Sequence, residues 1–367
     1  MKKKILYVSG TYCPAHGGAE VSMHTFLKMS LDTFDVLVAT DLSNSPNVRT
    51  QGHYENVPVN HITHHDRINS ISHLCTTYNP DVVITQLMWS DVALAVAKEL
   101  SIPSIYRLCK LPTEIDLRAG SQYEPTEIFG VSQATKDFSK ERWNRESHII
   151  CPPIDKTSVQ GTITNHWDCK YITIFNPVKK KGGFVFEQTA KALPSLQFAY
   201  VPGWDILRSG NKFDKTKIER LCLSIDGKYD GRIPTEPSFE GLANVTRISP
   251  TRQVSTIYDQ IRLLLMPSQW EEAFGRVAVE AMMNSIPVIG SSVGGLQDLV
   301  SQGGVVVNDF ANPKSWKDAI ESILIKSRYD IFSQRAREFT QKEYSIDKNV
   351  IMFKELVLSA SHRKKYF

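Results

Sequence analysis

Two glutamates in the second half of the chain, Glu272 and Glu280, enclose seven residues with the sequence AFGRVAV. The apolar run Leu263–Met266 precedes them and reads as a β-strand, and we expect a helix to begin near Gly275. The first backbone N–H groups of such a helix lack an acceptor within the helix and can point towards an anion. The two carboxylates would flank this helix start and could bind hydroxyl groups at both ends of a nucleotide sugar. The alternative is a capping acid followed by an ordinary buried amphipathic helix.

Two glycine-rich loops could provide lysine side chains and main-chain N–H groups that bind an anionic ligand. The segment Asn176–Gly183, NPVKKKGG, follows an apolar run, and its three lysines, with Lys181 best placed before the turn, could neutralise a diphosphate. The segment Ser9–Glu20 contains the pair Gly17-Gly18, which would let a ligand approach main-chain N–H groups. Neither segment has the G-x-G-x-x-G spacing or the P-loop form, which disfavours NAD binding and nucleoside triphosphate hydrolysis. A solvated basic loop and an ordinary turn are the alternative explanations.

Short apolar runs alternate with longer amphipathic stretches along the chain, which is typical of βαβ units around parallel sheets. The expected strands are Lys4–Val8, Val36–Ala39, Val82–Thr85, Ser104–Leu108, Ile128–Val131, Tyr171–Phe175, Phe198–Val201, Val245–Ile248, Leu263–Met266, Pro287–Gly290 and Val305–Val307. The expected helices include Ala19–Met29, Val92–Leu100, Phe184–Ala192, Val254–Tyr258, Arg276–Asn284, Pro313–Ile325 and Val350–Ser359. The fold class is therefore α/β with two doubly wound parallel-sheet domains, which bind ligands at the carboxyl ends of their strands.

The domain boundary is expected near Pro152-Pro153, where a polar stretch begins that extends to about Lys170 and reads as a linker. We expect one Rossmann-like domain over residues 1–152 and a second over residues 153–349. A C-terminal helix over residues 350–367 could pack back on the first domain. Residues 203–240 read as an irregular insertion of unassigned role, with a short helix near Thr216–Leu223.

The composition excludes several classes of protein. Of the 367 residues, 41% are hydrophobic and 22% are charged, which excludes disorder, collagen and coiled coils. No apolar run approaches the roughly 18 residues that span a membrane, and Ile5–Val8 is too short for an export signal. The cysteines form no C-x-x-C pair, and His61, His64 and His65 lack the spacing of a helical metal pair. With no membrane span, export signal or disulfide framework indicated, we expect a cytoplasmic protein. The net charge of +4 is too small to indicate nucleic-acid binding.

The segment around the two glutamates resembles a known family. Glu272 and Glu280 reproduce the E-x7-E signature of the retaining glycosyltransferases, most specifically family 4 of the GT-B fold, and the likeness extends through PSQWEEAFGRVAVEAMMNSIPVIGSSVGGLQDLV. The segment Gly17–Glu20 resembles the GGAE loop of that family, and Phe129–Ser132 resembles its VS strand end. The resemblance covers the chain from about residue 3 to residue 340. It implies two Rossmann-like domains that face each other across a cleft, an N-terminal acceptor domain and a C-terminal donor domain.

The resemblance also implies roles for individual residues. Glu272 would accept hydrogen bonds from hydroxyls of the donor sugar, and Lys181 would meet the leaving phosphate, which makes these two the catalytic candidates. Glu280 would bind the two ribose hydroxyls of the nucleotide. The other donor-binding residues would act through their backbone: Gly17, Gly18, Ile248 (beside Arg247, for the base), Phe274, Gly275, Arg276 and Val277.

The sequence departs from the family pattern at two places. Many members carry a G-R pair after the first strand of the second domain, where this chain has Asn176-Pro177, so that Lys179 or Lys180 could replace the arginine. Many members also have a histidine after the fourth N-terminal strand, where this chain has Arg107 and Cys109 instead. Both residues are candidate sugar contacts. If Arg107 reaches the cleft, the donor or the acceptor could carry a carboxylate.

The function that the resemblance implies is transfer of a hexosyl group, of glucose or uronate type, with retention at the anomeric carbon. The donor would be a nucleotide diphosphate sugar, a UDP-sugar in this interpretation, and the acceptor a saccharide or lipid-linked saccharide in cell-surface polysaccharide synthesis. No D-x-D sequence occurs, so we expect neither a metal ion nor another cofactor. The chain could associate peripherally with the inner face of the membrane, and its oligomeric state is left open. The alternatives are a nucleotide-sugar epimerase of the same fold and a non-catalytic nucleotide-sugar-binding protein.

Overall fold

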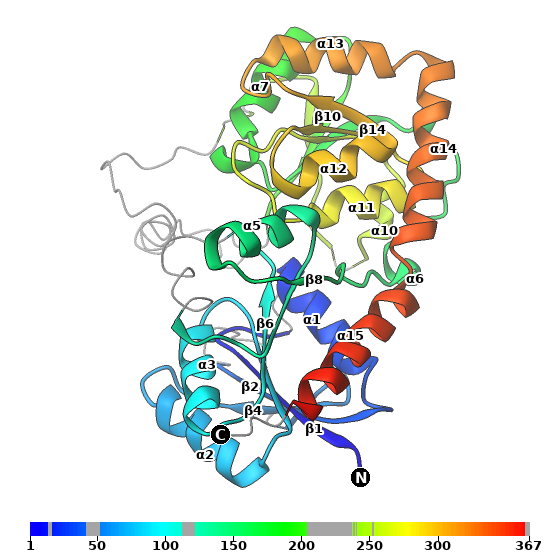
Figure 1. The fold of residues 1–367 in the computed structure, drawn as a ribbon. Helices are drawn as coiled ribbons and strands as arrows, with labels where there is room; N and C mark the ends of the chain where they lie inside the picture. The colour runs from blue at the N-terminus through cyan, green and yellow to red at the C-terminus, as the bar shows by residue number, and fades with distance from the viewer. Residues whose placement is uncertain are drawn as a thin grey trace. The chain divides into compact units, whose positions relative to one another are not determined.

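The computed structural model describes residues 1–13, 17–41, 52–111, 122–203, 237, 239, 241–251 and 253–363 (Figure 1). The chain forms two compact units. Unit 1 consists of Met1–Pro153 together with Tyr344–Phe367, and unit 2 consists of Ile154–Glu343.

Unit 1 is built on an eight-stranded sheet with the strand order β3-β4-β2-β1-β5-β6-β7-β8. The strands are β1 (Lys3–Ser9), β2 (Phe34–Thr40), β3 (Gly52–Tyr54), β4 (Val57–His61), β5 (Val82–Thr85), β6 (Ser104–Leu108), β7 (Glu127–Gly130) and β8 (His148–Ile149). Neighbouring strands are parallel, except that β3 and β4 form an antiparallel pair. The chain adds strands first on one side of β1 and then on the other, so the order reverses between β1 and β5. In open α/β sheets, ligands bind at the carboxyl ends of the strands at such a reversal.

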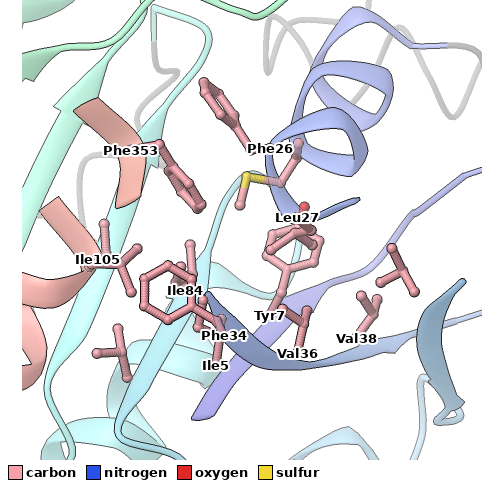
Figure 2. Packing of buried hydrophobic residues seen from close by; sticks show 14 of the residues in the cluster. Ile5, Tyr7, Phe26, Leu27, Phe34, Val36, Val38, Ile84, Ile105 and Phe353 are labelled. Atoms are coloured by element: carbon pink, nitrogen blue, oxygen red, sulfur yellow. The ribbon is translucent and has the colours of Figure 1, made fainter. Parts of the chain in front are cut away.

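Helices cover both faces of the sheet in unit 1. They are α1 (Gly18–Lys28), α2 (Arg67–Tyr78), α3 (Ser90–Glu99), α5 (Gln133–Trp143) and α15 (Ile346–His362). Ile5 and Tyr7 of β1 pack on one face with Phe26 of α1 and Phe353 of α15, as Figure 2 shows. The Phe26 and Phe353 rings stack with their centroids 4.7 Å apart. The intervening residues of β1 pack on the other face with α2 and α3, as the alternation of side chains along a strand requires.

Unit 2 is built on a six-stranded sheet of parallel strands with the order β11-β10-β9-β12-β13-β14. The strands are β9 (Tyr171–Phe175), β10 (Phe198–Val201), β11 (Val245–Arg247), β12 (Ile261–Met266), β13 (Val288–Ser291) and β14 (Gly304–Val307). The order reverses between β9 and β12. The doubly wound α/β class predicted for both halves of the chain is therefore confirmed.

The helices of unit 2 also lie on both faces of their sheet (Figure 1). They are α6 (Lys156–Val159), α7 (Gly183–Ala192), α10 (Ser255–Tyr258), α11 (Arg276–Met283), α12 (Gly294–Gly303), α13 (Pro313–Ile323) and α14 (Lys326–Glu343), with the short 3-10 helices η2 (His166–Asp168) and η3 (Lys179–Lys181). Phe186 of α7 and Trp316 of α13 belong to one apolar cluster with Ile172 and Leu263 of the central strands. This core fixes the strand ends from which the loops of the candidate site emerge.

Two features of unit 2 differ from the expectation. The polar stretch after Pro153 is not a free linker, because the Asp259 carboxylate accepts hydrogen bonds from the backbone of Thr162 and Ile163 and Asn284 accepts one from Gly161. The long helix α14 was not expected, because few of its side chains are buried and its apolar pattern is weak.

The expected insertion at residues 203–240 lies outside the described residues, apart from Gly203, Pro237 and Phe239. The same holds for the short helix expected near Thr216–Leu223. Among the helices that the structure describes, none combines the length and the apolar character needed to cross a membrane.

Candidate functional site

The candidate site lies at the carboxyl edge of the unit 2 sheet, where the loops after β9 and β12 meet. The backbone N–H of Gln269 donates to the carbonyl of Lys180 over 2.8 Å, which ties the two loops together. Gly182 has a φ of +78°, and a Cβ atom at this position would lie 1.8 Å from the carbonyl oxygen of Pro267. Only glycine permits both this backbone conformation and so close an approach. Gly182, the first of the two glycines that end the NPVKKKGG segment, therefore allows the two loops to lie this close together.

Lys181 and Glu272 form a partly buried ion pair between these loops. The Lys181 ammonium donates to Oε1 of Glu272, and the same oxygen accepts from Ser268 Oγ over 2.7 Å and from Trp270 Nε1 over 3.0 Å. The side chain of Glu272 is 8% exposed and that of Lys181 is 25% exposed. Among the described residues, no donor reaches Oε2 of Glu272, which leaves this oxygen to accept from a ligand.

The surroundings of Glu272 keep its carboxylate ionised. Burial acts to raise the pKa of Glu272, but the charge of Lys181 and the hydrogen bonds from Lys181, Ser268 and Trp270 outweigh it and hold the pKa below its usual range. The site therefore presents a negative oxygen beside a partly exposed ammonium group. Such a pair can bind hydroxyl groups on one side and a phosphate on the other.

Helix α11 begins at this edge, as the sequence predicts. Its N-cap, Gly275, has a φ of +91°, and the N–H of Ala278 donates to the Gly275 carbonyl over 2.9 Å. The N–H groups at the start of a helix have no acceptor within it and, with the helix dipole, favour an anion. Phe274 before the helix is buried, whereas Arg276 and Val277 at its start are half-buried.

Glu280 lies in the second turn of α11, and both of its oxygens have donors. Tyr258 donates its hydroxyl to Oε2 over 2.7 Å, and Arg276 donates Nε to Oε1 over 2.6 Å. Burial, together with the neighbouring Glu280 carboxylate, raises the pKa of Tyr258 well above its usual range. The phenol therefore remains protonated and holds the carboxylate in place.

Ile248 follows β11 at the same edge of the sheet, and its N–H donates to the carbonyl of Tyr200 over 2.9 Å. Lys180 lies over the Trp270 ring, 4.6 Å from its centroid, and Lys179 is exposed. The structure therefore gathers the predicted unit 2 residues at the carboxyl edge of one sheet.

The remaining predicted site residues belong to unit 1. Gly17 is the N-cap of α1 and Gly18 its first residue. Arg107 is only 1% exposed, and its guanidinium donates to the Ala19 carbonyl, to Gln86 and to Ser22. Contact between Arg107 and a sugar would require these hydrogen bonds to break. Burial raises the pKa of the Cys109 thiol to about 11, so this side chain is neutral at physiological pH.

Sequence reasoning missed three residues that hold the carboxylates. Ser268 and Trp270 lie inside the segment that was singled out, but their side chains had no assigned role. Tyr258 lies 22 residues before Glu280 and gave no sequence signal, because only the tertiary fold brings its hydroxyl to the carboxylate. In the part of the chain that the structure describes, no three His, Cys, Asp or Glu side chains gather into a metal site.

Comparison with a library of protein families matches residues 238–342 to the family described as glycosyl transferases group 1. Spore coat protein SA of Bacillus subtilis is 31% identical over 93 residues, which are 24% of this chain and 25% of that protein. The chain thus spans about a quarter of the length of this relative. A second relative, the uncharacterized glycosyltransferase MJ1178 of Methanocaldococcus jannaschii, is 24% identical over 350 residues, 90% of this chain and 92% of that protein.

Comparison with solved structures shows the fold of the whole chain. The crystal structure of Anabaena Alr3699/HepE in complex with UDP-glucose superimposes with a TM-score of 0.73 at 17% sequence identity, over 97% of this chain and 99% of that chain. The GT-B fold predicted from the sequence is confirmed by this superposition. The predicted family relationship is supported where residues 238–342 match the glycosyl transferases group 1 model.

Proposed function

We propose that this chain, whose residues 238–342 match the glycosyl transferases group 1 family, is a retaining glycosyltransferase that uses a nucleotide diphosphate sugar. The observation that carries the proposal is the Lys181–Glu272 pair, because it places a cation and an ionised carboxylate beside a helix start. The HepE structure in this family of folds is described as a complex with UDP-glucose. We take the donor to be a UDP-sugar with a glucose- or uronate-type hexose.

In the proposed complex, the donor lies along the carboxyl edge of the unit 2 sheet. Glu280 accepts hydrogen bonds from the ribose hydroxyls, and the backbone of Phe274–Val277 binds the diphosphate. Oε2 of Glu272 accepts from the sugar hydroxyls, and the backbone near Ile248 contacts the base. Contact of Gly17 and Gly18 with the donor phosphate, and of Arg107 or Cys109 with the sugar, remains a prediction.

The proposed reaction exchanges one bond at the anomeric carbon for another on the same face of the sugar. The bond from the anomeric carbon to the phosphate oxygen breaks, and a bond to the acceptor hydroxyl oxygen forms. The acceptor proton passes to the departing phosphate oxygen. Lys181 and the start of α11 stabilise the negative charge that develops on this phosphate, and Glu272 stabilises the positive charge on the sugar ring. The rest of the rate increase comes from positioning.

The acceptor is proposed at a coarser level, as a saccharide or a lipid-linked saccharide in cell-surface polysaccharide synthesis, with unit 1 as the acceptor domain. An epimerase of the same fold would need acid and base groups at the sugar, and a binding protein would need no acceptor at all. Because the pKa of Glu272 is held below its usual range, its carboxylate is a weak base and is not protonated to act as an acid, which favours transfer over epimerisation.

The test is incubation of the purified protein with UDP-glucose, UDP-galactose and UDP-glucuronate, followed by chromatography of the products. We expect slow release of UDP and free sugar from one donor without an acceptor, and loss of this release in Lys181→Ala. Conversion of one UDP-sugar into its epimer would assign the epimerase function instead. Binding of a UDP-sugar without any turnover, with or without oligosaccharide acceptors, would assign a binding protein.

A further inference from the structure

Arg276 lies at the wrong end of α11 for the stability of that helix. It is the first residue of the helix, and the first turn contains no acidic residue. A cation at this end is disfavoured by the helix dipole, whereas an anion is favoured. At this position the cation is offset by the Glu280 carboxylate one turn further along the helix, and a bound anion could take the place of that carboxylate.

The Arg276 side chain occupies an oxygen that the proposed nucleotide needs. Its Nε donates to Oε1 of Glu280, while Tyr258 holds Oε2. A ribose diol that donates to Glu280 competes with these two donors. Tyr258 is fully buried, with its ring 5.8 Å from that of Phe175, whereas the Arg276 side chain is 19% exposed. Arg276 is therefore the donor that can move.

The diphosphate needs a second cation in this chain. The Lys181 ammonium is already paired with Glu272, so it offsets only part of a diphosphate charge. Asn176-Pro177 supplies no cation at the end of β9. Lys180 is engaged over the Trp270 ring, and Lys179 is exposed. The Arg276 guanidinium is also paired, with Glu280, but it starts from the helix end whose N–H groups are expected to bind the phosphates.

We propose that Arg276 leaves Glu280 when the nucleotide binds and donates to its diphosphate, so that one side chain both vacates the ribose site and supplies the second cation. This inference rests on the proposed function and deepens it. It makes Arg276 a residue that discriminates between nucleoside diphosphates and nucleosides, in addition to the backbone contact expected from the sequence.

The test compares UDP with uridine in Arg276→Gln. We expect UDP to bind about 10- to 100-fold more weakly than to the wild-type protein, the range for one charge-assisted hydrogen bond. We expect uridine to bind as well as before or more tightly, because it no longer competes with Arg276 for Glu280. Calorimetry measures the UDP affinity, and displacement of UDP at millimolar concentration measures that of uridine.

Two further variants keep the test decisive. Arg276→Lys retains the charge without the planar guanidinium and should recover part of the UDP affinity. Lys314→Gln is the matched control, because Lys314 lies at the start of another helix, α13, and also pairs with a carboxylate four residues on, that of Asp318. This variant should leave the affinities for UDP and uridine unchanged. Thermal unfolding of each variant verifies that it is folded.

The outcomes separate the inference from the function on which it rests. If Arg276→Gln weakens the binding of UDP and of uridine equally, Arg276 is a fixed support for Glu280. The proposal that Arg276 leaves Glu280 on nucleotide binding would then be wrong. UDP affinity within threefold of wild type would remove Arg276 from the diphosphate site. Wild-type protein that binds none of UDP, ADP and GDP would overturn the proposed function itself. If ADP or GDP binds in place of UDP, the same comparison is made with the matching nucleoside.

Discussion

The reversal points of the two sheets are built alike but hold different chemistry. In unit 1 the reversal lies between β1 and β5, where the N–H of Gly10 donates to the carbonyl of Met88 over 2.9 Å. In unit 2 it lies between β9 and β12, where Lys181 meets Glu272. Both junctions close with a backbone hydrogen bond, from Gly10 in the first and from Gln269 to Lys180 in the second, but only the second adds a pair of charges.

The cations near these junctions also differ between the two units, in how far their side chains are buried. Arg107 in unit 1 is 1% exposed, and it holds the Ala19 carbonyl and Ser22 at the start of α1. Lys181 and Arg276 in unit 2 keep 25% and 19% of their side chains exposed. The same fold thus uses a charge for internal support in one unit and leaves charges accessible to a ligand in the other. From this difference we expect substitutions in unit 2 to change chemistry and those of Arg107 to change stability.

The largest effect is expected from Lys181→Ala. Removing one preorganised group that stabilises developing charge lowers turnover by about 10²–10³. The measurement is the rate of UDP release, with Lys191→Ala on the exposed face of α7 as a control that retains its turnover. An unchanged turnover number in Lys181→Ala would remove this residue from the mechanism.

The next effect separates the two glutamates. Glu280→Gln should weaken UDP binding about 10- to 100-fold, because it removes a charged hydrogen bond to a group that does not react. Glu272→Gln should lower kcat and leave UDP affinity nearly intact, because its carboxylate contacts the reacting sugar. Calorimetry measures the UDP affinity of each variant, and steady-state kinetics measure its kcat and KM. The reverse result would mean that the donor lies in the opposite direction along the motif.

A smaller effect is expected from Arg107→Met in unit 1. This change leaves Oε1 of Gln86 and Oγ of Ser22 without the donor that Arg107 supplies, and each such loss costs about 1–3 kcal/mol. Native-state hydrogen exchange of amides in α1 and β1 measures the local loss of stability. Unaltered exchange together with a lost transfer reaction would show instead that Arg107 contacts a substrate.

The smallest effect is expected from chelation. In the proposed mechanism Lys181 and the α11 start stabilise the leaving phosphate, so treatment with EDTA should leave the rate of UDP release unchanged within about twofold. The comparison is made on protein dialysed against EDTA, before and after addition of Mg²⁺ or Mn²⁺. A rate that disappears on chelation and returns with either ion would contradict the metal-independent mechanism.

Much of the fold was readable from the sequence because buried parallel strands are short, continuous apolar runs. Strands such as Tyr171–Phe175 and Ser104–Leu108 were predicted with their observed bounds. The helix α14 was missed because it buries few side chains. The stretch after Pro153 was misread because the backbone N–H groups of residues 161–163 donate to Asn284 and Asp259. Polar composition alone does not distinguish a linker from a packed loop.

The site was predictable only in part, for a similar reason. Glu272, Glu280 and Lys181 were identifiable because charged residues beside glycines at strand ends form a local pattern. The partners of these residues are set by tertiary packing, as the Tyr258 hydroxyl on Glu280 illustrates. The hydrogen bonds of Arg107 to α1 could not be predicted from the sequence, because its position on a strand does not reveal which helix covers its guanidinium.

The most direct measurement of the central claim is a crystal structure of this protein with UDP. The account predicts the ribose hydroxyls on Glu280, the phosphates at the N–H groups of residues 274–277 and at the Lys181 ammonium, and the base at the backbone near Ile248. A nucleotide whose phosphates lie away from both Lys181 and the start of α11, or whose ribose lies on Glu272, would contradict it.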